Sequence, residues 1–382
     1  MAEFIIFGAG KIARGFIAHL LHLAGRGFAF VEADAALAGL LEERGEYTVS
    51  VFGAPEKNCA VRGFRTIRAG DAEALKREAR GVTTIFTAVG GKNLPSVALS
   101  IAEVLKHAPG RPINVITCEN WKQPADIVRD EVLRVLPECA AGFSEAVVMR
   151  SAVEPDEELA RRDPLAVCVQ DYWRLPVDAG RLAAPLPEIP GIEPIQNFAG
   201  FLEQKFYTYN AANGTVSYLG ALLGHAYISD AARDSRIEPI LRMVYNETGR
   251  ALCAKHGIAP DDQAAFAGTS FAKLRDRIIV DTIERNARDP LRKLGPDDRL
   301  VGSARLALEY GAMPEGLACA IAAAVNYRHP GDPSAEELGR LYAREGIGGV
   351  LRTVCRILPG DGLYEMVIEK EKEMKAGGWI KT

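Results

Sequence analysis

The first residues of the chain constrain its fold most strongly. A short apolar run, residues 4–7, ends in Gly8-Ala9-Gly10, and a helical pattern follows directly. A strand, a glycine turn and a helix in this order leave the N–H groups of the helix N-terminus open to a pyrophosphate. Gly8 permits the tight turn, Gly10 lets the backbone approach phosphate, and Ala13 is the small residue that lets the helix pack on the strand. The pattern predicts a dinucleotide site, although glycine turns also occur in proteins that bind no nucleotide.

An acid at the end of the second strand is the expected partner of this turn. Residues 28–31 form a β-rich run, and Glu32 follows it. A carboxylate there hydrogen-bonds the adenosine ribose and repels a 2′-phosphate, so NAD is favoured over NADP. The alternative is that Glu32 is only a polar residue leaving a buried strand. Asp34 is predicted to be the N-cap of a helix over 35–44.

Alternating strands and helices continue through the N-terminal half. This alternation predicts an α/β, doubly wound Rossmann-type sheet covered on both faces. The expected strands are 47–52, 60–67, 83–89, 113–117 and 166–172, and the expected helices are 71–79 and 94–107.

Two loops of this sheet are predicted to approach the nucleotide, because ligands collect outside the carboxyl ends of parallel strands. The first is Gly90-Gly91, for which a hairpin or a plain loop is the alternative. The second carries Asn120, which either offers its amide to a substrate oxygen or to the nicotinamide, or caps a helix beginning near Trp121.

Length and proline content divide the chain. With 382 residues, two domains are expected. Five prolines and glycines between 185 and 194 predict a linker, because proline neither donates to a strand ladder nor fits inside a helix. Beyond residue 197 the patterns are long and helical. The predicted domains are therefore 1–195, which binds the nucleotide, and 196–382, which is mostly α-helical.

Composition excludes several classes of protein. The net charge of −4 gives no general reason to bind nucleic acid or an anionic membrane. Seven cysteines without a C-x-x-C pair favour reduced, mostly buried thiols and argue against structural zinc. No secretory signal and no apolar run near the ~20 residues of a membrane span are recognised, so a cytoplasmic location is expected.

The head of the second domain carries polar groups in an otherwise apolar stretch. On a continuous α-helix Lys205, Asn213 and Asn210 fall at about 0°, 80° and 140°, spread over about 12 Å of axis. They would then share one face, directed to a wet surface or to a polar cleft. Because Gly214 can break a helix, this geometry holds only if the break comes late.

Several motifs in the same order resemble those of the polyol-specific long-chain dehydrogenases, with the branch that acts on mannitol 1-phosphate as the nearest. The resemblance extends from residue 4 to at least Tyr310. Its motifs are Gly8-Ala9-Gly10-Lys11-Ile12-Ala13-Arg14-Gly15-Phe16-Ile17, Thr87-Ala88-Val89-Gly90, Cys118-Glu119-Asn120, Lys205 with Asn210, and Pro290-Leu291-Arg292-Lys293-Leu294 with Asp298-Arg299-Leu300.

The resemblance implies a Rossmann-type domain followed by a helical domain, an active site between them, and no metal. It assigns the catalytic lysine to Lys205 and the two amides that bind the substrate oxygen to Asn120 and Asn210. Ala88 and Val89 join the expected cofactor contacts together with Gly90. A lysine that accepts the hydroxyl proton at neutral pH needs its pKa of about 10.4 lowered by roughly 2 to 3 units.

Two positions depart from the family pattern. Asn213 stands where the family has a histidine, and asparagine donates a hydrogen bond but carries no proton near neutral pH. Met149 stands where relatives have an aspartate before Arg150. These changes leave the oxidoreductase assignment intact if Lys205 is the base, but they put the usual substrate in question.

Clustered cations suggest a phosphate site. Arg292, Lys293 and Arg299 suit a dianion, whereas their alternative role is ion pairing with nearby aspartates. Arg14 contacts cofactor or substrate, or belongs to the solvated surface. His225 has no partner at metal-ligand spacing, nor has His329, and both are expected to be packed or capping residues.

Three functions follow. The first is NAD-dependent hydride transfer between a polyol phosphate and a ketose phosphate, with D-mannitol 1-phosphate and D-fructose 6-phosphate as the expected pair. The second keeps the reaction but takes an unphosphorylated polyol or a sugar acid. The third is an NAD-binding protein without turnover. The expected partners are small molecules, and the expected state is a monomer or a small homo-oligomer.

Overall fold

The structure is a computed structural model, and it describes residues 2–108 and 110–380. The outer ends of the two predicted domains, residues 1 and 382, lie outside the described residues. No helix in the described part of the chain is long and apolar enough to cross a membrane.

The chain forms two compact units, which we call unit 1 (Met1–Phe198) and unit 2 (Ala199–Thr382). Compactness does not test whether each unit folds alone or works as a domain. The division into domains 1–195 and 196–382 therefore stays a prediction, and the two units are described separately.

In the described part of unit 1, six parallel strands form a sheet in the order β5-β2-β1-β6-β7-β8. Phe4 lies opposite Phe28 on one side of β1 and opposite Thr84 on the other. The chain leaves β1 toward β2 and returns to β6 on the other side, which makes the edge between β1 and β6 a topological switch point. The strands are β1 (Phe4–Phe7), β2 (Phe28–Glu32), β5 (Arg65–Arg68), β6 (Thr84–Thr87), β7 (Asn114–Thr117) and β8 (Gly142–Glu145).

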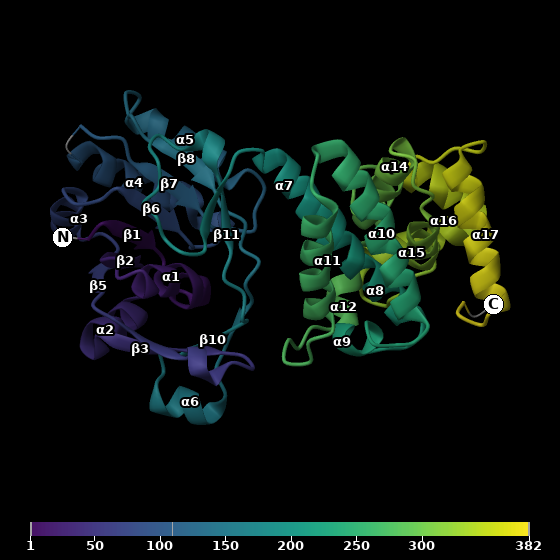
Figure 1. Ribbon diagram of the computed structural model, residues 1–382, viewed down its shortest axis with the longest axis horizontal. Helices are drawn as coiled ribbons and strands as arrows, with labels where there is room; N and C mark the ends of the chain where they lie inside the picture. Colours follow the sequence, from purple (N-terminus) through teal and green to yellow (C-terminus); the bar gives the residue numbers. More distant parts are fainter. Residues whose placement is uncertain (1, 109, 381–382) are drawn as a thin grey trace. The chain divides into compact units, whose positions relative to one another are not determined.

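Helices cover both faces of this sheet. On one face, α3 (Ala72–Ala79), α4 (Leu94–His107) and α5 (Pro124–Val135) pack their apolar sides on the strands. Figure 1 shows α4 and α5 on one side of the sheet and α1 (Ala18–Leu23) on the other. Burial on both faces explains why the strands are continuous apolar runs. The predicted doubly wound α/β fold is confirmed.

The predicted strand 60–67 is wrong. The segment forms β4 (Cys59–Arg62), which pairs with β3 (Glu46–Val51), and β5, which joins the large sheet. Gly63 between them has a φ of +76°, a conformation that glycine adopts without strain, and it turns the chain from one sheet to the other.

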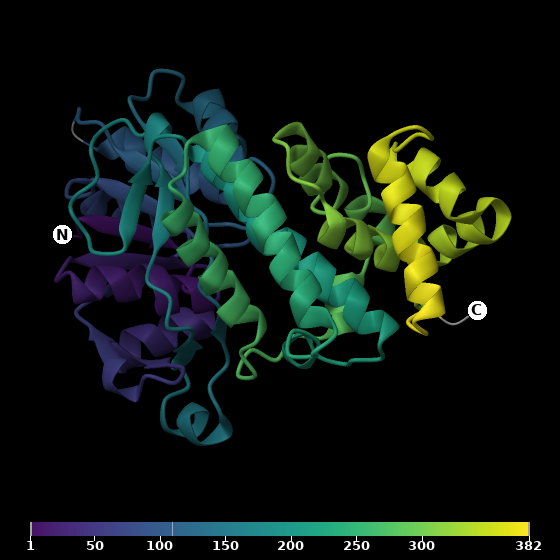
Figure 2. The same cartoon turned by 45° about the vertical axis from the view of Figure 1, so that its right-hand side comes forward.

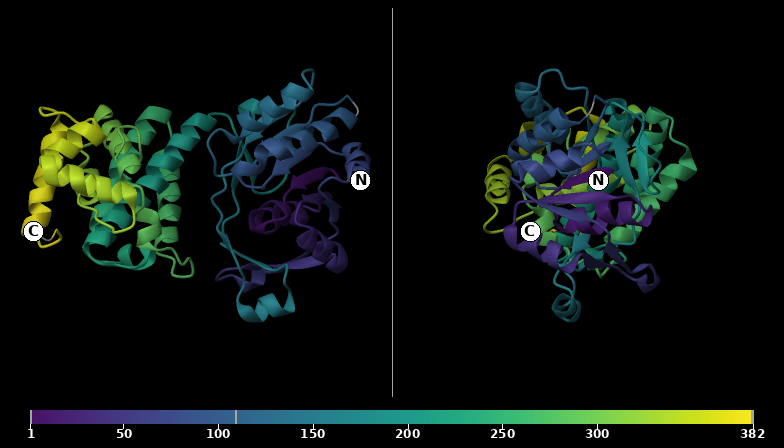
Figure 3. Two further views of the ribbon diagram at one scale, coloured as in Figure 1. Left: turned by 180° about the vertical axis from the view of Figure 1, so that it is seen from behind. Right: turned by 90° about the vertical axis from the view of Figure 1, so that its left-hand side faces the viewer.

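The smaller sheets hold the rest of unit 1. β3 and β4 continue into a four-stranded sheet with β9 (Ala152–Val153) and β10 (Val167–Val169). The predicted linker is wrong in part, because β12 (Ile192–Ile195) pairs with β11 (Leu175–Asp178) and Pro194 lies opposite Val177. Proline is tolerated in so short a sheet because its edges need no donor. The short helix α6 (Glu157–Arg162) stands out from the rest of unit 1, as the reverse view in Figure 3 also shows.

Unit 2 is built of helices, which pack around one large apolar core and a smaller apolar cluster, and Figure 2 shows these helices in teal to yellow. Its centre is α15 (Glu315–Val325), in which an alanine-rich run is completely buried and allows neighbouring helices to approach closely. The predicted helical second part is confirmed. The longer helices are α7 (Phe198–Lys205), α8 (Ala211–Leu222), α10 (Ile237–His256), α11 (Pro260–Leu274), α14 (Val301–Glu309), α15 (Glu315–Val325), α16 (Pro333–Val350) and α17 (Gly362–Ala376).

The cysteines are free thiols. The expectation that most are buried is wrong, because four of the seven, among them Cys59, are partly exposed. Burial raises the pKa of Cys118 and of Cys355.

Candidate functional site: a nucleotide edge and a cationic cluster

The glycine turn after β1 forms the centre of what we call the nucleotide edge: residues 8–14, Glu32, 88–90 and 119–120. Gly8 has a φ of +89°, and a β-carbon there would lie 2.6 Å from the carbonyl oxygen of Ala88. Gly10 is exposed and would meet no atom within 4 Å. The first glycine is therefore needed by the fold, whereas the second leaves open space in front of the backbone.

The helix after the turn starts with an unusual geometry. Residues Ala13–Ile17 form a π-helix (η1), which continues into α1. Gly15 lies so close to β10 that a β-carbon would come within 2.6 Å of Val169. Ala13 is buried, as the predicted packing role requires. The N–H groups of the first helical turn lack a carbonyl one turn earlier, so they are donors for an anion.

Glu32 is tied to the glycine turn. Its Oε2 accepts a hydrogen bond from the N–H of Ala9 at 2.6 Å, and its Oε1 accepts from the N–H groups of Ala33 and Asp34, both at 2.8 Å. A carboxylate offers about four acceptor positions, so Oε2 retains one for a further donor. Glu32 therefore does more than leave a strand. The predicted N-cap is confirmed, because Asp34 accepts from the N–H groups of Ala36 and Leu37.

Arg14 does not belong to the solvated surface, so that alternative is wrong. Its side chain is buried, and its guanidinium donates a hydrogen bond to the carbonyl of Ala9. Burial lowers the pKa of Arg14, and its Nε has no partner among the described residues. The visible role of Arg14 is to brace the turn, and a cofactor contact stays a prediction.

The ends of β6 and β7 are joined by a residue to which the sequence assigned no role. Glu119 is buried, and it accepts hydrogen bonds from the hydroxyl of Thr87 at 2.8 Å and from the N–H of Val89 at 3.0 Å. Burial raises the pKa of Glu119 while these bonds oppose the shift. Glu119 thus fixes the backbone of the 88–90 loop, in which Ala88 and Val89 are partly exposed and Gly90 is exposed.

The hairpin and capping alternatives for this edge are wrong. Gly90 has a φ of +83° and follows a strand whose neighbours are both parallel, so no hairpin forms there. Asn120 is exposed, and α5 begins only at Pro124 with Gln123 in the capping position. The amide of Asn120 is left available at the carboxyl end of β7.

Lys205 lies where α7 passes into a π-helix, η5 (Phe206–Asn210), which leads directly into α8. A π-helix turns less per residue than an α-helix. The angles calculated for a continuous α-helix are therefore wrong, and Asn210 and Asn213 are rotated relative to Lys205. Gly214 does not break the helix, because α8 continues through it.

The side chain of Lys205 is partly buried, and no hydrogen bond or ion pair of its amine is recorded with residues 2–108 or 110–380. Burial first and the charge of Arg299 second lower the pKa of Lys205 from its usual 10.5. A carboxylate beside the amine would have the opposite effect. The surroundings therefore favour the neutral amine, which accepts a proton.

The two amides after Lys205 are positioned differently. Asn210 is partly buried at the start of α8, and its side chain makes no capping hydrogen bond. Asn213 donates from Nδ2 to Oδ1 of Asn286 at 3.1 Å. Asn286, whose role the sequence did not indicate, also donates to the carbonyl of Thr282 at 2.9 Å, and this fixes its orientation.

The predicted phosphate ligands lie in a group that we call the cationic cluster: Lys205, Lys273, Arg292, Lys293 and Arg299. Lys293 is buried, donates to the carbonyl of Asn286 at 2.5 Å, and has its pKa lowered to about 8 by burial and by Arg299 and Arg292. Arg299 lies over the ring of Phe206 at 5.5 Å from its centre.

Both arginines of the cluster also have acidic partners. Arg292 is bonded to Asp289 at 2.6 Å and lies 3.4 Å from Asp298. Arg299 donates to Asp298 at 2.9 Å. The ion pairs that the sequence offered as the alternative to phosphate binding are present, and a phosphate contact stays a prediction.

Lys273, near the end of α11, was not noticed in the sequence. Burial and then the charge of Lys205 lower its pKa to about 8, and Asp281 opposes the shift. Its signal was the spacing of Gln263, Phe266 and Ser270, which predicts one face of a helix but not what that face packs on.

The remaining polar candidates are structural. His225 pairs with Asp234 at 2.8 Å, and His329 lies 3.8 Å from Glu284. Within the described residues, no group of three or more His, Cys, Asp or Glu side chains is placed to hold a metal ion. Met149 is buried, and its sulfur accepts from the hydroxyl of Tyr172 at 3.8 Å.

Comparison with known proteins gives consistent matches. The model of the mannitol dehydrogenase Rossmann domain matches residues 2–191, and that of the mannitol dehydrogenase C-terminal domain matches residues 197–343. The mannitol-1-phosphate 5-dehydrogenase of Brevibacillus brevis (strain 47 / JCM 6285 / NBRC 100599) is 33% identical over 381 residues, which cover 97% of each chain.

Two solved structures share the fold. D-sorbitol dehydrogenase in its substrate-free form has a TM-score of 0.79 at 16% identity, covering 99% of this chain and 94% of that one. Pseudomonas fluorescens mannitol 2-dehydrogenase, solved as a ternary complex with NAD and D-mannitol, has a TM-score of 0.63 at 15% identity, covering 99% and 92%. At this identity the likeness establishes the fold.

Proposed function

The chain belongs to the mannitol dehydrogenase family of oxidoreductases, and from this we propose that it transfers a hydride between NAD(H) and a polyol phosphate. The proposed pair is D-mannitol 1-phosphate and D-fructose 6-phosphate. Its relative from Brevibacillus brevis carries the name mannitol-1-phosphate 5-dehydrogenase at 33% identity, which supports this choice. A lysine and amides, rather than a metal ion, handle the proton and the charge on oxygen.

The nucleotide edge fits NAD. The open space before Gly10 and the N–H groups of the following helical turn suit a pyrophosphate, and the remaining acceptor position of Glu32 suits a ribose hydroxyl. A 2′-phosphate would meet the negative charge of Glu32, so NAD is proposed over NADP. The loop 88–90, held by Glu119, flanks the same edge. When bound, NAD⁺ supplies the hydride acceptor.

Unit 2 supplies the acid–base chemistry. In the oxidation, Lys205 accepts the proton of the substrate hydroxyl, while the amides of Asn120 and Asn210 donate hydrogen bonds to the oxygen as its negative charge grows. In the reduction, Lys205 returns the proton. Asn213 binds a neighbouring hydroxyl, and the domains 1–195 and 196–382 divide cofactor from substrate binding. Catalysis requires the Lys205 amine to reach the alcohol beside the nicotinamide.

One observation carries this function: the amine of Lys205 has no carboxylate partner in the described chain and lies near Arg299, an environment that lowers the pKa of Lys205. Changing Lys205 to Ala should lower kcat by roughly 10³-fold, in the range expected for a lost general base, and leave NADH binding intact. Stopped-flow turnover and fluorescence titration with NADH measure the two. Near-normal turnover of the variant would refute the base.

A second candidate function is the same reaction with an unphosphorylated polyol or a sugar acid. It is favoured by the ion pairs of Arg292 and Arg299 with Asp289 and Asp298, which compete with a phosphate. NADH oxidation followed in parallel with fructose 6-phosphate, fructose and a hexuronate separates the candidates. Turnover of fructose 6-phosphate alone supports the first, and turnover of an unphosphorylated substrate alone supports the second. NADH binding without turnover of any of the three indicates an NAD-binding protein that is not an enzyme.

A further inference from the structure

Trp121 differs in its position from the other exposed apolar side chains of unit 1. It is 50% exposed, and it follows Asn120 shortly after the end of β7, at the carboxyl ends of the parallel strands. Among the described residues of unit 1, the other large apolar side chains that are exposed lie on helices α1, α4 and α5: Leu23, Leu99 and Val135. Single exposed apolar residues are common on helices. Trp121 instead exposes a large aromatic ring where a parallel sheet binds its ligands.

The indole of Trp121 packs on Gly91, the first residue of the short helix η3 (Gly91–Asn93). A β-carbon at Gly91 would lie 2.7 Å from Cε3 of Trp121 and closer still to Cγ and Cδ2. Gly91 does not have a positive φ, so the indole, rather than the backbone conformation, leaves no room for a side chain. The loops after β6 and β7 are therefore joined twice, by this contact and by the hydrogen bond from Val89 to Glu119.

The order of the strands indicates which half of NAD this part of the edge would meet. The order β5-β2-β1-β6-β7-β8 is that of a dinucleotide-binding sheet, in which the two halves of the dinucleotide lie on opposite sides of the switch point. With the adenosine ribose at Glu32, as proposed above, the adenosine half belongs to the side of β2. The nicotinamide half then belongs to the side of β6 and β7, from which Trp121 projects.

We propose that the exposed side of the Trp121 indole packs against the nicotinamide half of NAD and limits the positions that the nicotinamide ring can take. An indole suits this contact, because it offers a large apolar surface, has two rotatable bonds and stacks on other rings. Gly91 determines where the indole lies, and Glu119 holds the neighbouring loop. The inference rests on the proposed use of NAD, and it is independent of Lys205 and of the substrate.

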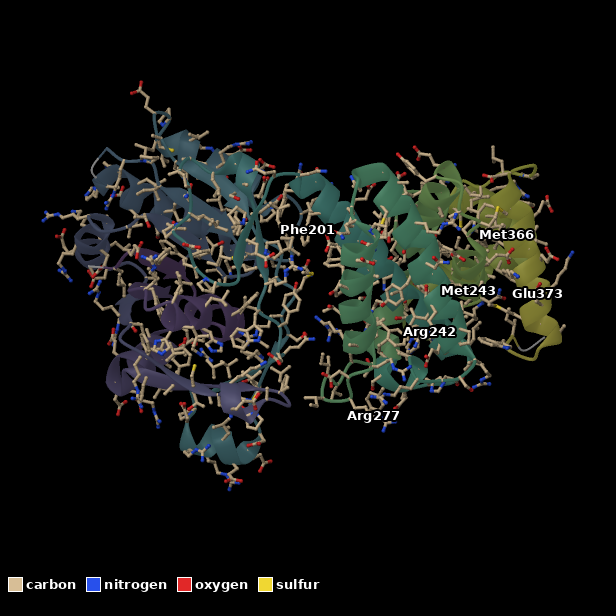
Figure 4. All side chains as sticks on the ribbon, viewed as in Figure 1. Phe201, Arg242, Met243, Arg277, Met366 and Glu373 are labelled. Atoms are coloured by element: carbon tan, nitrogen blue, oxygen red, sulfur yellow. The ribbon has the colours of Figure 1, made fainter. Side chains whose placement is uncertain are left out.

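Trp121→Leu removes the ring and keeps an apolar side chain. It should raise the Kd of NAD⁺ about tenfold, because an aromatic contact is lost, and leave the Kd of ADP-ribose, which lacks nicotinamide, within about twofold. Isothermal titration calorimetry measures both. Met243→Ala is the matched control, because Met243, which Figure 4 labels on α10, is also large, apolar and exposed. It should change neither Kd.

Tryptophan fluorescence follows the ring itself. NAD⁺ does not absorb the light that tryptophan emits, so it quenches an indole only on contact. Saturating NAD⁺ should quench part of the wild-type fluorescence, whereas saturating ADP-ribose should not. This part should be absent from Trp121→Phe and present in Trp379→Phe, which replaces a tryptophan of unit 2. Quenching by NAD⁺ that persists in Trp121→Phe would show that the quenched indole is another one, and would overturn the inference.

Gly91→Ala tests the same contact without changing the tryptophan. The added β-carbon must displace the indole, so the Kd of NAD⁺ should rise while that of ADP-ribose stays near the wild-type value. If Trp121→Leu does not fold, Gly91→Ala replaces it with the same outcomes. Equal losses of NAD⁺ and ADP-ribose affinity, or an unchanged Kd of NAD⁺, overturn the inference and leave the proposed function standing. A wild-type protein that binds neither ligand refutes the proposed function as well.

Discussion

The nucleotide edge and the cationic cluster differ in the groups they offer. The edge offers backbone N–H groups and glycines, and Glu32 and Glu119 accept hydrogen bonds from backbone donors. In the cluster, the groups are long side chains, such as those of Lys205 at the end of α7 and of Arg299 in the turn before α14. The register of the parallel strands determines the positions of the groups at the edge. In the cluster, the direction of each side chain depends on its angle around the helix axis, and a single π-helix changes that angle.

This difference predicts how each region tolerates substitution. A site built from the backbone is disrupted when a β-carbon is added to a glycine, because a positive φ and close contacts leave no room for that carbon. Side-chain sites fail when a charge or a hydrogen bond is removed, while the fold survives.

The largest effect is expected from Gly8→Ala. Its φ of +89° and the carbonyl oxygen of Ala88 at 2.6 Å should lower the free energy of unfolding by about 2–4 kcal/mol and weaken NADH binding severely. Gly10→Ala is the matched variant, because its β-carbon meets no atom within 4 Å. It should unfold like the wild type yet bind NADH at least tenfold more weakly. Urea unfolding measures the stability of each variant, and titration with NADH measures its affinity. Tight NADH binding by Gly10→Ala would show that the pyrophosphate does not lie at this position.

The second effect concerns the two arginines of the cationic cluster. The side chain of Arg299 is 12% exposed, whereas that of Arg292 is 55% exposed. A charged contact is stronger where water is excluded, so Arg299→Met should raise KM for a phosphorylated substrate by roughly 100-fold, and Arg292→Met by tenfold or less. Equal effects on phosphorylated and unphosphorylated ketoses would show that neither arginine binds phosphate. Circular dichroism controls for the loss of the ion pair with Asp298.

A smaller effect is expected from Asn286→Ala. The substitution frees the amide of Asn213 and keeps the backbone carbonyl that accepts from Lys293, so kcat/KM should fall about tenfold, as for one lost hydrogen bond of about 1–1.5 kcal/mol. Asn326→Ala is the control, because Asn326 bonds Glu371 elsewhere in unit 2. An Asn213→Ala, Asn286→Ala double variant should be no worse than the poorer single variant. Additive losses would show that Asn286 does not act through Asn213.

The sequence predicted the nucleotide edge better than the cluster. The strand, glycine turn and cap around Gly8 and Asp34 depend on neighbours in the chain, and all three are present. The phase of Asn210 and Asn213 was wrong because no local pattern signals the π-helix at Phe206–Asn210. Lys273 was missed for a related reason, since Lys205, whose charge lowers the pKa of Lys273, lies 68 residues away in the sequence.

Two further misses come from long-range contacts. Gly63 lies inside a run that reads as one strand, and only pairing to two different sheets reveals the turn. Glu119 was part of a recognised motif, but its role depends on β6 lying beside β7, which brings Val89 within hydrogen-bonding distance. The periodicity of apolar residues describes a single segment, whereas the turn at Gly63 and the role of Glu119 depend on how two segments pair.

The smallest effect is expected from the ionisation of Glu119 at the nucleotide edge, which should make stability depend on pH. Burial raises the pKa of Glu119 above 4.5, so the folded protein holds a proton that the unfolded chain releases. The stability from this proton is fully present below about pH 4.5 and is lost as pH rises through the folded-state pKa. Glu119→Gln has no carboxyl to titrate, so its stability relative to the wild type should rise as the pH rises through that range. Urea unfolding at a series of pH values measures the difference. A gap that stays constant with pH would mean that Glu119 is as easily ionised in the folded protein as in the unfolded chain, and that its hydrogen bonds to Thr87 and Val89 offset the cost of burial.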